Sequence, residues 1–140
     1  AGEPIPLYGD GQNVRDWLYV EDHVEALLLA ASRGRLGESY CVGGAGDHHT
    51  PSERTNREVI KSICELLDRQ CVEAGPHARL IQSVPDRLGH DRRYAIDALK
   101  ITKELGWKPS HSFESGLEST VQWYSTNLEW SERMLGRSAI

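Results

Sequence analysis

Residues 84–97 read V-P-D-R-L-G-H-D-R-R-Y-A-I-D, and eight of these fourteen side chains are ionisable. Pro85 and Gly89 are residues typical of turns, and Asp97 can cap a helix that begins directly after it. A turn with this density of charge is either a solvated set of Asp–Arg pairs or a segment that holds a charged ligand. The stretch alone leaves both interpretations open.

A second informative stretch, residues 6–23, reads P-L-Y-G-D-G-Q-N-V-R-D-W-L-Y-V-E-D-H. We expect a short strand at Ile5–Tyr8 that ends at the turn Gly9-Asp10-Gly11. The apolar run Trp17–Val20 is a strand or the lead into a helix. Glu21–Ser32 is expected to be a helix, because apolar residues recur on one face at helical spacing: Val24, Leu27, Leu28 and Ala31.

The rest of the chain alternates short strands with helices. We expect strands at Ser39–Val42 and Arg79–Val84. A helix over Ala98–Leu105 should be capped by Asp97 and ended by Gly106, and another should begin at Ser112 or Ser115, with one apolar face: Leu117, Val121, Tyr124 and Leu128.

Two segments read as capping boxes, Thr50-Pro51-Ser52-Glu53 and Thr55-Asn56-Arg57-Glu58. The second should open an amphipathic helix to about Arg69, with these residues inward: Val59, Ile60, Ile63, Leu66 and Leu67. The order of elements predicts a small mixed α/β subdomain and not a complete doubly wound sheet.

Composition limits the classes of function. The 140 residues fit one domain, with 39% hydrophobic residues and a net charge of −5. The acidic balance argues against a nucleic-acid partner, although two or three arginines can still hold one small phosphorylated ligand. The longest apolar run, Ala26–Ala31, is far too short to span a membrane, and no signal peptide is visible.

Cysteine and histidine usage argues against a metal site. Cys41, Cys64 and Cys71 are odd in number and lack C-x-x-C spacing, which fits neither a disulfide framework nor structural zinc. A reducing cytoplasm is the simplest setting. The adjacent pair His48-His49 lies in a polar loop and does not converge on one ion, and Cys64 is expected to be buried on a helix.

Together these stretches resemble the extended short-chain dehydrogenase/reductases that act on nucleotide sugars, and within that group the dTDP-glucose 4,6-dehydratase family. R-D-W-L-Y-V-E-D-H at residues 15–23 narrows the choice to the extended reductases, and D-R-L-G-H-D-R-R-Y-A-I-D at residues 86–97 separates the dehydratases from related epimerases and decarboxylases. Further support comes from S-Y-C-V-G-G at residues 39–44, E-L-G-W-K-P at 104–109 and F-E-S-G-L-E-S-T-V-Q-W-Y at 113–124.

The resemblance implies an NAD-dependent lyase. The family oxidises the sugar C4 hydroxyl, eliminates water across C5–C6 and returns the hydride to C6. The present sequence has no G-x-x-G-x-x-G after an apolar strand and no Tyr-x-x-x-Lys. We therefore expect residues 1–140 to be the carboxy-terminal substrate-binding portion of the enzyme, without its Rossmann domain and without a catalytic residue of its own.

Several expectations follow from that assignment. NAD would be bound by the missing domain, and dTDP-glucose would be the substrate. The full enzyme would form a homodimer through the missing domain, while this fragment would be a monomer. Two alternatives stay open: a fragment of a related epimerase or decarboxylase, and a non-catalytic module that binds sugar nucleotides.

The resemblance also assigns roles to six residues. Arg15 and Arg87 match arginines that contact the diphosphate, where a planar guanidinium can make two parallel bonds. Pro6 and Tyr8 match residues beside the base and deoxyribose, Asn56 an asparagine near the nucleotide. His90 is assigned to hydrogen bonding near the phosphates or sugar. The alternatives are surface ion pairs for the arginines, an ordinary strand residue for Tyr8 and an ordinary helix start for Asn56.

Other residues are assigned to structure. Arg92 and Arg93 are expected to pair with Asp86, Asp91 or Asp97, and the tryptophans are expected to pack in the core or at a domain interface: Trp17, Trp107, Trp123 and Trp130. Two departures from the family pattern are Leu88, where proline is usual, and Cys41, where asparagine is usual.

Overall fold

The computed structural model describes residues 2–44 and 52–136. The described residues form two small sheets and five α-helices. Strand β1 (Ile5–Tyr8) pairs in parallel with β4 (Ile81–Val84), and β2 (Val14–Asp16) pairs antiparallel with β3 (Glu53–Thr55). This is the small mixed α/β arrangement expected from the sequence.

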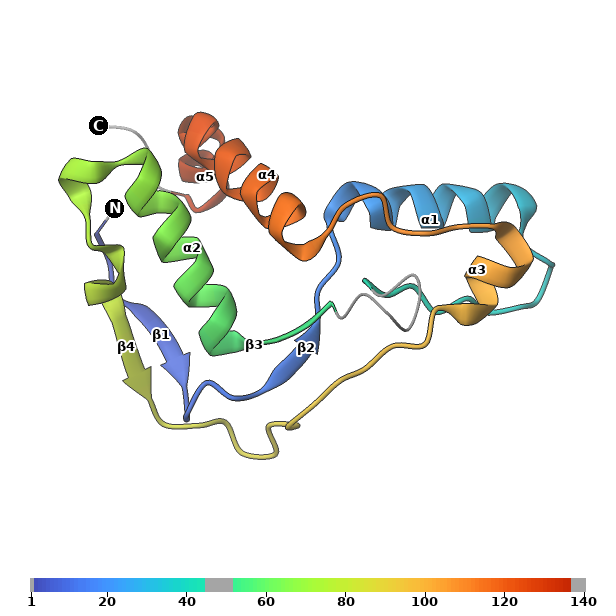
Figure 1. The fold of residues 1–140 in the computed structure, drawn as a ribbon, viewed down its shortest axis with the longest axis horizontal. Coiled ribbons are helices and arrows are strands. Elements are labelled where there is room, and N and C mark those ends of the chain that lie inside the picture. Colours follow the sequence, from blue (N-terminus) through green and yellow to red (C-terminus); the bar gives the residue numbers. More distant parts are fainter. Residues whose placement is uncertain (1, 45–51, 137–140) are drawn as a thin grey trace.

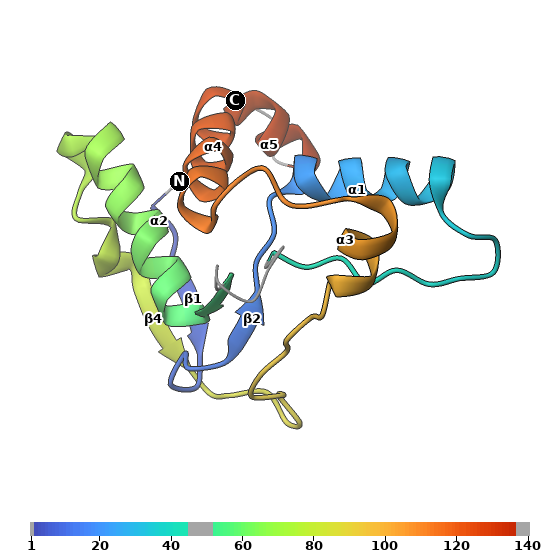
Figure 2. The same cartoon turned by 45° about the vertical axis from the view of Figure 1, so that its right-hand side comes forward.

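The helices divide between two regions (Figure 1). Helices α1 (Val20–Arg33) and α3 (Leu99–Leu105) pack on each other at one end of the molecule. Helix α2 (Asn56–Gln70) packs against α4 (Phe113–Thr126) beside the β1–β4 pair, and α5 (Leu128–Met134) follows α4. Figure 2 shows the same division after rotation, with residues 85–97 running between the two regions.

Two 3₁₀ turns, η1 (Val72–Ala74) and η2 (His77–Leu80), connect α2 to β4. The strand expected at Arg79–Val84 is therefore shorter than predicted. Asp68 fixes this connection, because its carboxylate accepts hydrogen bonds from the backbone N–H of His77 at 2.8 Å and from the His77 ring at 2.5 Å.

The capping box at Thr55 is confirmed. The Thr55 hydroxyl accepts from the Glu58 N–H at 3.1 Å, and the Glu58 carboxylate accepts from the Thr55 N–H at 2.7 Å. Cys64 is buried in α2 as expected, together with Val59 and Leu66. The capping box expected at Thr50–Glu53 lies partly outside the described residues, and Glu53 begins β3. The pair His48-His49 lies wholly outside the described residues.

Gly106 ends α3 as predicted, but the helix begins at Leu99 with Ala98 at its cap position, so Asp97 lies one residue before the predicted cap. Asp97 Oδ1 accepts a hydrogen bond from the Leu99 N–H at 2.8 Å, and Gly106 ends the helix with φ of +71°. The core between α1 and α3 consists of Ala26, Ala98, Ile101 and Trp107, with Leu18, Leu29, Tyr40, Val42 and Leu105 packed against it.

The helix predicted at Glu21–Ser32 is confirmed as α1, but its apolar face is not its buried face. Asp22 and Ala26 are the buried residues of this helix, whereas residues of the apolar face are exposed: Val24 at 47%, Leu27 at 55% and Leu28 at 65%. Helix α1 packs on α3 through its other side. An apolar stripe is thus left uncovered by the described residues.

The strand expected at Ser39–Val42 is also wrong. These residues lie in no strand or helix, because no other described strand pairs with them. Strands β2 and β3 were not predicted, since each is only three residues long. The last helix begins after Ser112, as predicted, but divides at Asn127, and Tyr124 and Leu128 of its apolar face are half or more exposed.

The tryptophans have different surroundings. Trp107 is buried in the core, as predicted. Trp123 and Trp130 are 45% and 41% exposed and stack edge-on against each other, with ring centroids 5.1 Å apart.

No helix within residues 2–44 and 52–136 has the length and apolar character needed to cross a membrane.

Candidate sugar-nucleotide site

The carboxyl ends of the parallel strands β1 and β4 bring two predicted site residues together. β1 ends at Tyr8 and β4 ends at Val84, which are paired in register. The segment after β4 then places the Arg87 guanidinium over the Tyr8 ring, 4.2 Å from its centroid. Pro6 lies two residues before Tyr8 and therefore on the same face of the strand.

Asp86 organises the turn that carries Arg87 and His90. Its carboxylate accepts from the Arg87 N–H at 2.9 Å and faces the His90 Nδ1 at 2.7 Å. The His90 hydrogen bond, followed by that of the Arg87 N–H, lowers the pKa of Asp86 below its ordinary value, so it is a carboxylate at neutral pH. The His90 side chain is 14% exposed, so it braces the turn.

Gly9 is required for this arrangement. Its φ is +57°, which favours glycine, and a Cβ at this position would lie 2.9 Å from the Asp86 carboxylate. The Gly9 N–H also donates to the Val84 carbonyl at 3.0 Å. The turn after β1 and the turn after β4 are therefore in direct contact.

Arg15 on β2 lies beside the later part of the same segment. Its guanidinium lies over the Tyr94 ring, 4.4 Å from the centroid, and donates to the carbonyls of Val14 at 2.7 Å and Asp91 at 3.0 Å. Both predicted diphosphate arginines thus lie on tyrosine rings. Arg87 belongs to the exposed segment 85–97, and Arg15 belongs to strand β2 beside that segment.

Asn56 is the first residue of α2, and its backbone is not available to a ligand. The Asn56 N–H donates to the Asn13 carbonyl at 3.0 Å, and the Arg57 N–H donates to the Gly11 carbonyl at 2.9 Å. Because Thr55 holds the Glu58 N–H, three of the first donors of the helix are satisfied internally. A contribution of Asn56 to binding would have to come from its half-buried side chain.

Arg92 and Arg93 do not pair as predicted. Arg92 contacts Asp10 at 3.3 Å, and Arg93 makes a two-point bond to Glu53 with both distances 2.7 Å. This bond raises the pKa of Arg93 and lowers that of Glu53. Local aspartates were expected because they are close in sequence. The partners lie instead on segments that the fold brings alongside, the turn after β1 and strand β3.

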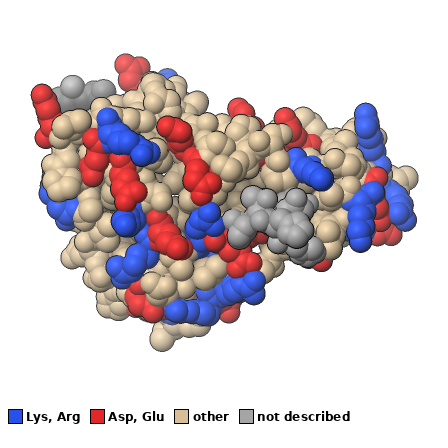
Figure 3. All heavy atoms as spheres, in the orientation of Figure 1, with Lys and Arg blue, Asp and Glu red and all other residues tan. Residues whose placement is uncertain are grey.

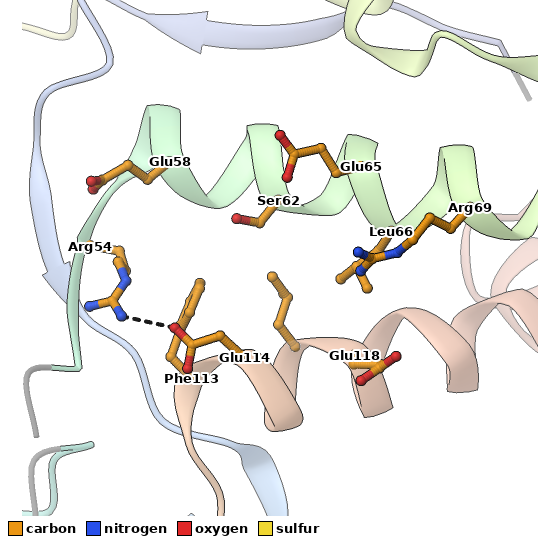
Figure 4. A pocket seen from close by; sticks show the side chains of 10 residues that line it. Arg54, Glu58, Ser62, Glu65, Leu66, Arg69, Phe113, Glu114 and Glu118 are labelled. Carbon is orange, nitrogen blue, oxygen red and sulfur yellow. Dashed lines mark hydrogen bonds and ion pairs between the residues drawn. The ribbon is translucent and has the colours of Figure 1, made fainter.

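Two hollows of the described surface are not lined by any of the six predicted residues. One, of about 360 Å³, lies between α2 and α4, where the Arg54–Glu114 ion pair of 3.0 Å crosses its end (Figure 4). Its lining has more carboxylates than arginines, which disfavours a diphosphate: Arg54, Glu58, Ser62, Glu65, Leu66, Arg69, Phe113, Glu114, Leu117 and Glu118.

The other hollow, of about 370 Å³, lies between the start of α1 and α4 and has mostly aromatic and apolar walls. Acidic and basic side chains are interspersed over the face in Figure 3, without a separate basic region. Among residues 2–44 and 52–136, no cluster of three or more histidine, cysteine or acidic side chains could hold a metal ion.

Residues 1–120 match the family model described as GDP-mannose 4,6 dehydratase. The chain belongs to this family. It is 51% identical over 140 residues to a dTDP-glucose 4,6-dehydratase of Xanthomonas campestris pv. campestris, covering 99% of this chain and 38% of that protein. It is 50% identical over 129 residues to the enzyme of the same description from Salmonella typhimurium, covering 92% of this chain and 34% of that one.

Solved structures of dTDP-glucose 4,6-dehydratases agree with the fold. A dTDP-glucose 4,6-dehydratase from Bacillus anthracis in complex with NAD superposes with a TM-score of 0.75 at 46% identity, over 92% of this chain and 37% of that chain. One from Streptomyces venezuelae with NAD and dTDP bound gives a TM-score of 0.77 at 40% identity, over 92% and 36%. The present chain therefore spans a little over a third of the relatives it matches.

Proposed function

We propose that this chain binds the nucleoside diphosphate part of a dTDP-sugar, as the substrate-binding part of a dTDP-glucose 4,6-dehydratase. The observation that carries the proposal is the joining of Tyr8, Arg87 and His90 at the ends of β1 and β4. Arg15 is presented from β2 beside the same exposed segment. Two guanidinium groups held on tyrosine rings supply fixed cationic donors, which a diphosphate requires.

The stacked arginines change the role proposed for Tyr8. The Arg87 guanidinium covers one side of the Tyr8 ring at 4.2 Å, so a base would have to pack on the opposite side of the ring or at its edge. Pro6, on the same face of β1, is exposed and provides an adjacent apolar contact. Tyr8 thus both orients Arg87 and offers surface to the base or deoxyribose.

Residues that fit NAD are not found in this chain. Its sequence has no glycine-rich dinucleotide turn and no Tyr-x-x-x-Lys, and its described strands form two separate two-stranded sheets. We assign NAD and the acid–base chemistry to the part of the relatives that this chain does not span. The role of the present residues is to hold and orient the substrate.

The uncovered surfaces support the same division. Within residues 2–44 and 52–136, the stripe Val24, Leu27 and Leu28 on α1 is exposed, and no strand pairs with Ser39–Val42. Exposed apolar area of this kind marks a contact surface, and we propose that residues 1–140 are one domain that packs there on the remainder of the enzyme. Two further expectations stay predictions. One is the cytoplasmic setting, which the three free cysteines suggest, and the other is a homodimer formed through the domain that this chain does not span.

Calorimetric titration of the chain with dTDP tests the proposal. We expect binding in the micromolar to millimolar range, because one wall of the site is absent, and weaker binding of UDP and GDP. Removing a charge-assisted hydrogen bond costs roughly 1.5–3 kcal/mol, so Arg87→Ala and Arg15→Ala should each weaken dTDP binding about ten- to hundredfold.

Arg69→Ala is the matched control, because Arg69 lies in the groove between α2 and α4 and should not affect dTDP. Unfolding curves of each variant confirm that the fold is intact. Equal dTDP affinity for the parent and Arg87→Ala would show that the segment 85–97 is only a solvated turn. A preference for UDP would favour the epimerase alternative.

A further inference from the structure

Arg15 is held more completely than a surface arginine usually is. One face of its guanidinium lies on the Tyr94 ring, and two of its nitrogens donate to the carbonyls of Val14 and Asp91. A guanidinium has five N–H donors. Two of them face these carbonyls, which leaves the remaining donors for a ligand.

Tyr94 is itself fixed at both ends. Its hydroxyl donates to the Asp91 carboxylate, and its backbone N–H donates to the Val14 carbonyl at 3.1 Å. The Val14 N–H in turn donates to the Arg92 carbonyl at 2.8 Å. The ring therefore has a defined position relative to β2, although Tyr94 is 51% exposed.

Asp91 joins the two residues. Its carboxylate holds the Tyr94 hydroxyl, and its carbonyl accepts from both Arg15 and the Asn13 side chain, the latter at 3.2 Å. The hydrogen bond to Asp91 raises the pKa of Tyr94 above its ordinary value. The phenol thus stays neutral and keeps donating over the working pH range of an enzyme.

We propose that Tyr94 is a positioning residue, which holds the Arg15 guanidinium ready for the diphosphate through its ring and through the hydroxyl bond to Asp91. This inference rests on the function proposed above. Without the ring, Arg15 would regain side-chain rotamers that must be lost again on binding. Tyr94 therefore acts on affinity through Arg15 and needs no contact of its own with the nucleotide.

A double-mutant cycle with dTDP tests this role. Tyr94→Leu should weaken dTDP binding roughly three- to tenfold, because the freed Arg15 side chain must be immobilised again on binding, while Tyr94→Phe keeps the ring and should lose about twofold. In the Arg15→Ala background, Tyr94→Leu should have no further effect. Tyr124→Leu is the control, because Tyr124 is equally exposed at 50% and packs on Trp123 instead.

The Arg15 side chain provides a second readout that requires no nucleotide. The ring current of Tyr94 should displace the Arg15 Nε–H resonance in the NMR spectrum, and this displacement should persist in Tyr94→Phe and vanish in Tyr94→Leu. This pattern would show that the Tyr94 ring lies on Arg15 in solution, whereas the double-mutant cycle shows whether the stack contributes to affinity.

Two outcomes overturn the inference. If Tyr94→Leu weakens dTDP binding by the same factor with and without Arg15, or leaves it unchanged, Tyr94 does not act through Arg15. If the parent chain binds no dTDP, the proposed function fails and this role fails with it, while the Arg15 resonance still reports whether the stack exists.

Discussion

Gly9→Ala should disturb the candidate site through a single methyl group. Gly9 has φ of +57°, and a Cβ there would lie 2.9 Å from both Cγ and Oδ2 of Asp86. This separation is too short for a carbon–carbon or carbon–oxygen contact, so Asp86 would have to move. Asp86 in turn holds the Arg87 N–H at 2.9 Å and His90 at 2.7 Å.

The magnitude has two parts. A left-handed backbone costs any residue with a Cβ about 1–2 kcal/mol. Moving the Asp86 carboxylate weakens two hydrogen bonds, each worth about 0.5–1.5 kcal/mol net. Gly106→Ala isolates the first part, because Gly106 has φ of +71° and nothing within 4 Å of its Cβ position.

Urea unfolding followed by tryptophan fluorescence measures the difference between the two variants. We expect Gly106→Ala to lower the free energy of unfolding by about 1 kcal/mol and Gly9→Ala by about 1–2 kcal/mol more. Only Gly9→Ala should also weaken dTDP binding, since Asp86 orients Arg87. Equal losses of stability in the two variants, with unchanged dTDP affinity, would refute the proposed link between Gly9 and Asp86.

Two further predictions concern stability outside the site. Thr55→Ala removes the capping box of α2 and should lower the free energy of unfolding by about 1 kcal/mol, while Thr55→Ser should retain most of it; a urea midpoint unchanged in Thr55→Ala would contradict this. The hydrogen bonds from the His77 backbone and ring lower the pKa of Asp68 in the folded state, so this stabilising contribution is present at neutral pH and is lost as the pH falls through the folded-state pKa. Denaturation at a series of acidic pH values should therefore show a shallower fall in stability for Asp68→Asn than for the parent, and parallel curves would argue against it.

Local signals in the sequence predicted the elements that depend on neighbouring residues. The Thr55 capping box and the Gly106 end of α3 rest on contacts a few residues apart, and both are confirmed. The strand Ile5–Tyr8 is confirmed as well, because its ends are marked locally, although its partner β4 is distant in sequence. Only the family resemblance predicted that Tyr8 and Arg87 belong to the same site. Nothing in the local pattern shows that β1 and β4 are neighbours.

The wrong predictions share a physical cause, which is dependence on partners distant in sequence or outside the described chain. The periodicity of α1 correctly identified an apolar face, but periodicity does not show which part of the protein covers that face. Ser39–Val42 has the composition of a strand, yet a strand needs a neighbour for its backbone. The Arg93–Glu53 and Arg15–Tyr94 contacts join segments that no sequence spacing relates.

The parallel pairing of β1 with β4 also determines when the site can form. Ile5 pairs with Ile81, so more than half of the chain must be closed into a loop before the two strands meet. Closing such a loop costs entropy before any contact compensates for it, and distant pairings of this kind slow folding. Helix α2, with its own cap and local contacts, can form earlier. Tyr8 and Arg87 should therefore be among the last residues to acquire their native neighbours, and during synthesis on the ribosome the nucleotide site would stay open until the residues after β4 have emerged.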